Sequence, residues 1–125
     1  MKIESAVRIT TNSKVAYYDD IHGIGLFFKV KFNGLWGVIN QDGTEICIPK
    51  YDDISCFKNG FAKVKLNGLW GFVNQEGKQI CIPRYLEVCD FENDFAKVKV
   101  NKSWGFKDEN GLWGFIDKNG KFRKK

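Results

Sequence analysis

Two stretches of this chain are near copies of each other, and they decide its fold. Residues 30–54 read VKFNGLWGVINQDGTEICIPKYDDI, and residues 64–88 read VKLNGLWGFVNQEGKQICIPRYLEV. The Trp-Gly pairs that begin at Trp36, Trp70 and Trp104 follow one another at a spacing of 34 residues. Self-similarity at a fixed period of this length is the signature of a repeat architecture. The sequence therefore predicts a tandem array.

Local signals within one repeat favour β-structure. The alternating segment Phe61–Leu66 leads into Asn67-Gly68, a strong signal for a two-residue hairpin turn, and Leu69–Asn74 returns along it. A third short strand, Gln79–Ile82, is expected to end at Pro83. No i, i+3, i+4 pattern persists long enough for a helix of ordinary length. Each unit is therefore predicted to hold two or three short antiparallel strands.

A hairpin of this size is not stable alone, so we expect neighbouring units to cover one another's apolar faces. The predicted fold is all-β, with tandem antiparallel β-hairpin repeats of about 34 residues forming one compact repeat domain, solenoid-like or a partly closed sheet. A solenoid, a closed barrel and a propeller-like arrangement all stay open at this point. The expected division is an N-terminal cap strand at 1–17, repeat 1 at 18–50, repeat 2 at 51–84, a truncated repeat 3 at 85–106 and a C-terminal capping hairpin at 107–125.

The spacing of the Trp-Gly pairs shortens near the C-terminus. A fourth Trp-Gly pair begins at Trp113, only nine residues after Trp104. With Asn110-Gly111 as its turn, Asp108 would face Trp113 where the other units have lysine. Terminal repeats are atypical and need a polar outer face. We therefore predict that Trp113 belongs to a cap that ends the array.

The hairpin turns also predict which side chains share a face of the sheet. The register of a two-residue turn places a lysine directly across from each array tryptophan. These candidate binding pairs are Lys31 with Trp36, Lys65 with Trp70, and Lys99 with Trp104. We expect the indoles to be core and the lysines to reach solvent; the alternative is that the pairs form a ladder that grips an extended ligand. The glycine after each tryptophan is expected to allow a close backbone or ring approach, or a bulge.

The composition is that of a globular chain with a mild basic excess. Its 125 residues are 43% hydrophobic and carry a formal net charge of +5. Lysines interleaved with acidic residues favour an acidic protein partner over nucleic acid. No apolar run is long enough to cross a membrane, and the N-terminal residues do not resemble a secretory signal, so we expect a cytoplasmic location.

No constellation in the sequence indicates catalysis, a metal site or a bound cofactor. The spacing of Cys47, Cys56, Cys81 and Cys89 matches no zinc pattern, and we expect these thiols to be structural. The adjacent carboxylates in Tyr18–Ile21 and Tyr51–Ile54 are expected to shape loops by accepting backbone hydrogen bonds. His22 has no serine or cysteine partner in a recognisable arrangement, so we expect no enzyme activity.

These motifs together resemble the bacterial WG-repeat family. The matching elements are a Trp-Gly strand, a glycine turn, an Ile-Pro segment, a Tyr-Asp loop and a Phe-Ala-Val strand, here Trp36–Ile39, Gly43, Ile48-Pro49, Tyr51–Ile54 and Phe61–Lys65. The resemblance covers about residues 18–120 and implies β-rich repeats used as binding or scaffolding modules, with no catalytic residues and no agreed ligand.

From the resemblance we expect a non-enzymatic protein-interaction or scaffolding module. One version is a bacterial immunity protein that neutralises a toxin. A carbohydrate or cell-envelope binding module is the alternative. Association of two copies through edge strands also stays open, because an exposed edge invites pairing.

Overall fold

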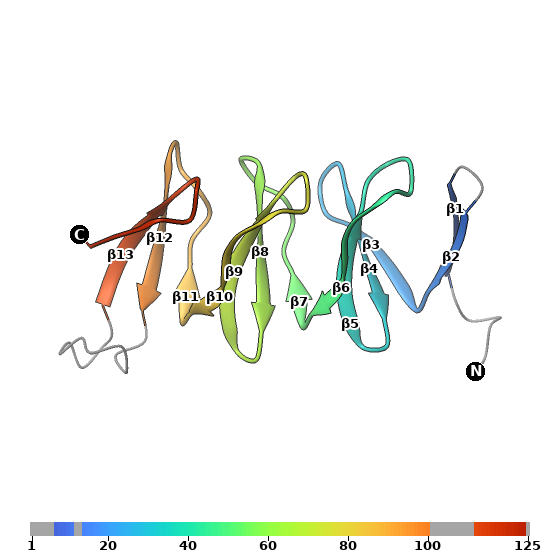
Figure 1. Cartoon of the computed structure of the whole chain (residues 1–125), viewed down its shortest axis with the longest axis horizontal. Helices are drawn as coiled ribbons and strands as arrows, with labels where there is room; N and C mark the ends of the chain where they lie inside the picture. The colour runs from blue at the N-terminus through green and yellow to red at the C-terminus, as the bar shows by residue number, and fades with distance from the viewer. Residues whose placement is uncertain (1–6, 12–13, 101–111, 125) are drawn as a thin grey trace.

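The computed structural model describes residues 7–11, 14–100 and 112–124, and its regular elements in these ranges are all β-strands. They form a two-stranded hairpin followed by three four-stranded antiparallel sheets. Figure 1 shows the sheets side by side along the long axis of the molecule, in sequence order. Pairing among the described strands stays inside each sheet, so the array is an open row. The predicted all-β repeat fold is confirmed. The described part of the chain contains no helix long and apolar enough to traverse a lipid bilayer.

Within each sheet, strands that follow one another in sequence are neighbours. The hairpin consists of β1 (Val7–Thr11) and β2 (Lys14–Tyr18). The first sheet contains β3 (Asp20–Gly23), β4 (Phe28–Phe32), β5 (Leu35–Ile39) and β6 (Glu45–Tyr51). The second contains β7 (Asp53–Ile54), β8 (Phe61–Leu66), β9 (Leu69–Asn74) and β10 (Gln79–Tyr85). The third contains β11 (Glu87–Val88), β12 (Phe95–Val100), β13 (Leu112–Asp117) and β14 (Phe122–Lys124).

The hairpin between β8 and β9 shows how the sequence builds a unit. Asn67 and Gly68 have φ angles of +54° and +82°, the pair of positive values that a tight mirror-image turn requires. The resulting register places Leu66 opposite Leu69, as predicted. An Asn-Gly turn with the same backbone sign at residues 33–34 joins β4 to β5.

Each sheet holds four strands, where the sequence predicted two or three per unit. The Tyr-Asp segment supplies the additional strand, because β7 pairs with β8 at Asp53–Lys65 and Ile54–Val64. The expectation that Pro83 ends the third strand is also wrong, since β10 continues through it. β10 lies at the edge of its sheet and bulges there, so a proline without an N–H is tolerated.

This bulge explains the glycines that follow Trp36 and Trp70. In the second sheet, β10 bulges at Ile82–Arg84 where it passes Gly71. A Cβ at Gly71 would overlap the Cys81 carbonyl oxygen and would lie 2.8 Å from the Pro83 nitrogen. Gly37 stands in the same position under the bulge of β6. The predicted close backbone approach and the predicted bulge are both confirmed at these positions.

The C-terminal part of the chain differs from the expected division. β12 pairs with β13, so that Val98 lies opposite Gly114 and Ala96 lies opposite Ile116. β13 also pairs with β14, which makes residues 112–124 an integral part of the third sheet. Within the described residues, 112–124 therefore belong to the third sheet and do not form the separate capping hairpin that was expected at 107–125. At the other end, where one cap strand was expected at 1–17, the described residues form two paired strands, Val7–Thr11 and Lys14–Tyr18.

The physical reason for the register of β13 lies in the core. Ile116 is fully buried and occupies the place that Val73 has in the second sheet. If Trp104 paired with β12 instead, the spacing of the sequence would put Lys107 at this buried position. Burying an unpaired charge costs several kcal/mol, so the second Trp-Gly copy is preferred.

Apolar clusters lie between successive elements of the row, and they confirm that neighbouring units cover one another. Between the first two sheets the cluster contains Ile24, Val38, Cys47, Tyr51, Ile54, Ala62, Val64 and Val73. Between the second and third sheets it contains Phe72, Cys81, Tyr85, Phe91, Ala96, Val98, Val100 and Ile116. Tyr18 of β2 packs with Val30 and Ile39 on the other face of the first sheet.

Glycine turns bring the second and third sheets against the sheets that precede them. A Cβ at Gly77, in the turn after β9, would overlap the Ile46 carbonyl oxygen of β6. A Cβ at Gly120, in the turn after β13, would overlap the Ile80 carbonyl oxygen of β10. Both glycines also have positive φ angles, 81° and 83°. The array thus repeats one contact in which a turn rests on the edge strand of its predecessor.

Candidate functional site

Two of the three predicted Lys–Trp pairs are present. Lys31 lies opposite Trp36 and Lys65 lies opposite Trp70. Their Nζ atoms are 5.6 Å and 5.5 Å from the indole centroids, a distance at which the ammonium is attracted to the ring face. The Asn-Gly turns produce this arrangement, because they fix the register of both hairpins.

The third predicted pair is wrong. Lys99 lies opposite Trp113, with its Nζ 5.9 Å from the indole centroid. Trp104 and Asp108 lie outside the described residues. The last sheet therefore continues the Lys–Trp ladder that we expected it to break.

Sequence reasoning missed a second lysine beside two of the indoles. Lys29 Nζ is 4.6 Å from the Trp36 centroid, and Lys97 Nζ is 4.8 Å from the Trp113 centroid. Both are closer than the directly opposite lysines. The signal was present in the alternating Lys-Val-Lys of each strand, which puts two lysines on the face of the tryptophan.

The indoles are both core and surface. Trp36 packs against the cluster between the first two sheets, yet it stays half-buried, as do Trp70 and Trp113. Trp36 therefore contributes apolar packing at the margin of its sheet, while lysines lie over all three rings.

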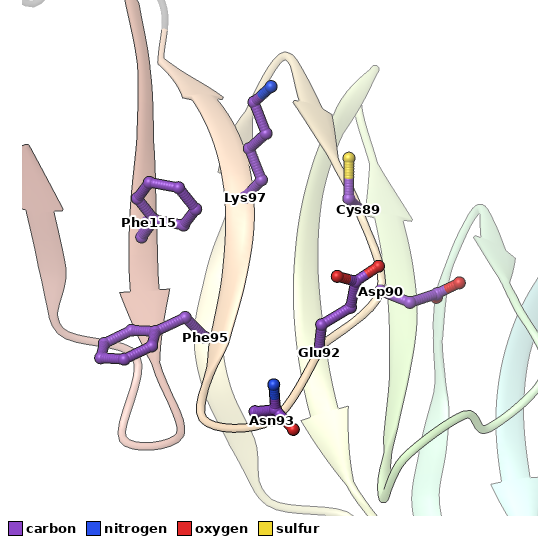
Figure 2. A pocket seen from close by; sticks show the side chains of 7 residues that line it. All are labelled: Cys89, Asp90, Glu92, Asn93, Phe95, Lys97 and Phe115. Carbon is purple, nitrogen blue, oxygen red and sulfur yellow. The ribbon is translucent and has the colours of Figure 1, made fainter. Parts of the chain in front are cut away.

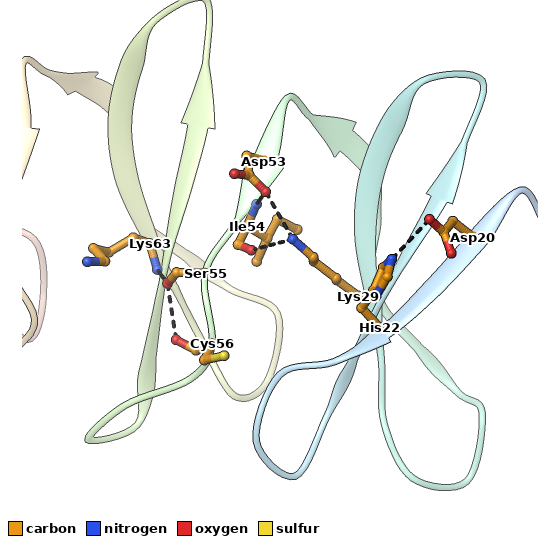
Figure 3. Close-up of polar contacts among 8 residues, drawn as sticks. All are labelled: Asp20, His22, Lys29, Asp53, Ile54, Ser55, Cys56 and Lys63. Atoms are coloured by element: carbon orange, nitrogen blue, oxygen red, sulfur yellow. Dashed lines mark hydrogen bonds and ion pairs between the residues drawn. The ribbon is translucent and has the colours of Figure 1, made fainter.

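Trp36 borders a groove of about 450 Å³ between the first and second sheets. Its wall combines the indole with the side chains of His22, Lys29 and Asp53. Figure 3 shows that Lys29 crosses the junction, where Nζ donates to Asp53 Oδ1 at 3.1 Å and to the Ile54 carbonyl oxygen at 3.2 Å. The groove offers an aromatic platform with polar groups around it, an arrangement suited to binding.

His22, which lines this groove, pairs with Asp20. His22 Nε2 is 3.0 Å from Asp20 Oδ2, and the imidazole lies 5.7 Å from the Trp36 indole, centroid to centroid. The hydrogen bond with His22, together with that from the Ile21 amide, lowers the pKa of Asp20. Asp20 is thereby held as an anion, which suits charge pairing better than proton transfer.

Ser55, on the opposite wall, is engaged with the backbone. Its Oγ donates to the Cys56 carbonyl oxygen at 3.1 Å and accepts from the Lys63 amide at 2.8 Å (Figure 3). These bonds direct the hydroxyl away from a base, so it is not set up as a nucleophile.

The Tyr-Asp loops form hydrogen bonds to backbone amides, as expected. Asp19 Oδ2 accepts from the Asn33 amide at 3.0 Å, and Asp52 Oδ2 accepts from the Asn67 amide at 2.8 Å. Each aspartate thus caps the neighbouring Asn-Gly turn. Among the described residues no group of three or more His, Cys, Asp or Glu side chains is arranged to hold a metal ion.

A repeated apolar feature lies on the bulged edge strands. Ile48 of β6 and Ile82 of β10 occupy equivalent positions and are 59% and 55% exposed. Lys50 and Arg84 follow two residues later and are also exposed. We call Ile48, Ile82, Lys50 and Arg84 the bulge ridge. Sequence reasoning missed it, because the Ile-Cys-Ile pattern alone does not say which side chains point outward.

The cysteines between these isoleucines point inward. Cys47 and Cys81 are buried, and their Sγ atoms lie 3.6 Å and 3.4 Å from the carbonyl oxygens of Ile48 and Ile82. Burial raises the pKa of Cys81 to about 11. These two thiols are therefore protonated packing groups, as expected of structural cysteines.

Comparison with known proteins agrees with the repeat architecture. The model of the family described as WG containing repeat matches residues 36–70 and 70–104, which together make up more than half of the chain. No curated protein and no solved structure matches this chain.

Proposed function

The chain belongs to the WG-repeat family, and we propose that it is a non-catalytic module that binds another protein through the bulge ridge. The observation that carries the proposal is the exposure of Ile48 and Ile82 at equivalent positions of two successive sheets. Isolated apolar side chains on a surface need no explanation, but a repeated exposed feature is typical of an interaction site. Burying one such side chain contributes about 1.5–3 kcal/mol.

The chemistry of the bulge ridge selects the kind of partner. Lys50 and Arg84 add positive charge beside the isoleucines, in a chain whose net charge is +5. A partner with apolar side chains flanked by acidic residues complements this surface. The bulges and prolines disfavour pairing of a foreign strand at these edges, so recognition here uses side chains.

One specific version of this function is an immunity protein that covers a bacterial toxin in the cytoplasm. A neighbouring gene for a secreted multidomain toxin supports this version, and a neighbourhood without one contradicts it. Association of two copies through the short edge strands β3, β7 or β11 is another version of this proposal. Light scattering at several protein concentrations tests it directly.

Carbohydrate or cell-envelope binding is the second candidate, and the Trp36 groove favours it. An indole beside Lys29, His22 and Asp53 offers a sugar both stacking and hydrogen bonds. Titration of tryptophan fluorescence with a broad glycan panel tests this candidate. A saturable change that Trp36→Phe removes supports it, and an unchanged signal across the panel rejects it.

The experiment for the leading proposal is capture from an extract of the source organism. The chain is immobilised as wild type, as the double variant Ile48→Asp/Ile82→Asp, and as Leu26→Asp, an exposed leucine away from the bulge ridge. Circular dichroism first verifies that all three fold. We expect wild type and Leu26→Asp to retain the same protein, and the double variant to retain at least tenfold less. Equal retention by the double variant, or no retained protein at all, contradicts the proposal.

A further inference from the structure

At the junction between the second and third sheets, a phenylalanine of one sheet fills a socket on the other. Phe91 is fully buried, stacks on Phe61 at a centroid distance of 4.1 Å and meets Phe72 edge-on at 5.0 Å. The side-chain amide of Asn59 donates a 2.6 Å hydrogen bond to the Phe91 carbonyl oxygen. Aromatic packing and this hydrogen bond thus hold Phe91 in place.

Two lysines of the second sheet pair with Asp90, the residue before Phe91. Lys63 Nζ is 3.6 Å from Asp90 Oδ1, and Lys58 Nζ is 3.7 Å from Asp90 Oδ2. We call Asn59, Phe61, Lys63 and Phe72 the filled socket. Its occupant is the pair Asp90-Phe91 of the third sheet.

The junction between the first and second sheets has the same kind of occupant. There Phe57 of the second sheet packs on Phe27 of the first, with centroids 4.6 Å apart. The residue before Phe57 is Cys56, which carries no charge. Both junctions therefore contain a phenylalanine from the later sheet, while the residue before it differs.

The third sheet carries a copy of this socket on its outer face. Lys97 lies opposite Phe115 as Lys63 lies opposite Phe72. The bridge between Glu92 and Phe95 repeats the bridge between Lys58 and Phe61. Asn93 has a φ of +58°, against +55° for Asn59, so the two loops share the same backbone turn. We call Asn93, Phe95, Lys97 and Phe115 the open socket.

Figure 2 shows the side chains of the open socket around a pocket of about 390 Å³. Phe95 is 43% exposed, although its counterpart Phe61 is covered by Phe91. No following sheet stands beyond the third one in the described part of the chain, and the outer face keeps the aromatic surface that the inner junctions bury.

One difference between the two sockets predicts the sequence of the occupant. Glu92 stands where the filled socket has Lys58, so the open socket is lined by one lysine, Lys97, and by a carboxylate of its own loop. An acidic residue before the phenylalanine would be attracted by Lys97 and repelled by Glu92. An uncharged residue, as in Cys56-Phe57, fits this pair better.

We infer that the open socket binds a protein partner through a phenylalanine that an extended segment presents, with an uncharged residue before it. The phenylalanine stacks on Phe95 and meets Phe115, and its carbonyl oxygen accepts from the Asn93 side-chain amide. This inference rests on the proposed protein-binding function, but it uses a different surface from the bulge ridge.

The probe is a synthetic peptide of residues 53–59 with Cys56→Ser, because this segment fills the first junction. Titration into the ¹⁵N-labelled chain, followed by NMR, is expected to give saturable shifts at the Asn93 side-chain amide and at β12 and β13. Replacing the peptide phenylalanine by alanine should weaken binding at least tenfold. Asn93→Gly, which keeps the positive φ accessible, should weaken it about three- to tenfold.

Ile82→Ser is the matched control, since it alters the bulge ridge and leaves the open socket intact. Binding of the peptide to this variant at wild-type affinity, with loss in Phe95→Ser, supports the inference. Equal binding of the alanine peptide overturns it, and so does concentration-dependent dimerisation of the chain that Phe95→Ser abolishes, because the occupant is then a second copy. Failure of the peptide with intact capture through the bulge ridge overturns the inference alone and leaves the proposed function standing.

Discussion

Replacing Gly77 by alanine tests whether successive sheets depend on the turn that rests on the preceding edge strand. Gly68→Ala is the matched control. The two glycines have nearly the same φ, +81° and +82°, but a Cβ at Gly68 meets nothing within 4 Å, whereas one at Gly77 would overlap the Ile46 backbone.

The expected costs follow from this geometry. An alanine held at such a φ costs about 1–2 kcal/mol, which applies to both variants and is partly offset by reduced freedom of the unfolded chain. Gly77→Ala adds an overlap with backbone atoms that cannot rotate away, and overpacking of this kind costs about 1–3 kcal/mol. The free energy of unfolding should therefore fall by about 1–3 kcal/mol more for Gly77→Ala than for Gly68→Ala.

Urea unfolding followed by tryptophan fluorescence and circular dichroism measures this difference. Hydrogen exchange then locates it: Gly77→Ala should loosen the junction of the first two sheets, where the Tyr51 hydroxyl donates to Gln79 Oε1 at 2.6 Å, and should spare the next junction. If both variants lose the same stability within about 0.5 kcal/mol, the turn-to-edge contact does not hold the array together.

Three further predictions concern the bulge, the thiols and the buried phenols. Gly71→Ala should lower the free energy of unfolding by about 3 kcal/mol, because its Cβ would enter the backbone of Cys81–Pro83. The control Gly23→Ala, with open space around the new Cβ, should change this free energy by less than about 1 kcal/mol. Equal thermal midpoints for the two variants would refute the role of the bulge. In the native chain a thiol reagent should modify the exposed Cys56 and Cys89 quickly and the buried Cys47 and Cys81 only on unfolding, and mass spectrometry that finds uniform labelling contradicts their burial. Burial raises the pKa of Tyr85 to about 12, so between pH 10 and pH 12 the unfolded chain releases a proton that the folded chain keeps. The free energy of unfolding should therefore fall by roughly 1.4 kcal/mol per pH unit for this group. A free energy of unfolding that does not change over this pH range contradicts the burial of the phenol.

The sequence predicted the hairpins because the turn chemistry acts locally. Asn67-Gly68 specifies a two-residue turn, and this turn alone sets Lys65 against Trp70. The same reasoning predicted that the glycine after tryptophan admits a close neighbour, since a residue without a side chain on a strand marks such an approach.

The register of the last sheet could not be obtained locally, because two Trp-Gly copies compete for one strand position. Both copies have acceptable spacing from β12, and only packing against the core separates Ile116 from Lys107. The passage of β10 through Pro83 was missed for a related reason. A proline ends a central strand but is tolerated at an edge, and edge position depends on the topology of the whole sheet.

The candidate binding surfaces also depend partly on local sequence and partly on the fold as a whole. Two of the three direct Lys–Trp pairs were predicted correctly, whereas the outward direction of Ile48 and Ile82 follows from a bulge that no alternation rule encodes. The open socket depends on the number of sheets in the described row, because Phe61 and Phe95 both begin a Phe-Ala-Lys-Val-Lys strand, and only Phe61 is covered by a further sheet.

The pairing of β12 decides both the length of the array and the presence of the open socket, so one NMR measurement tests the account most directly. Nuclear Overhauser contacts between the backbones of β12 and its partner strand identify the residue opposite Lys99. The account predicts contacts of Lys99 with Trp113 and of Lys97 with Phe115. Contacts of Lys99 with Trp104 instead would contradict the register of the third sheet and remove Phe115 from the socket.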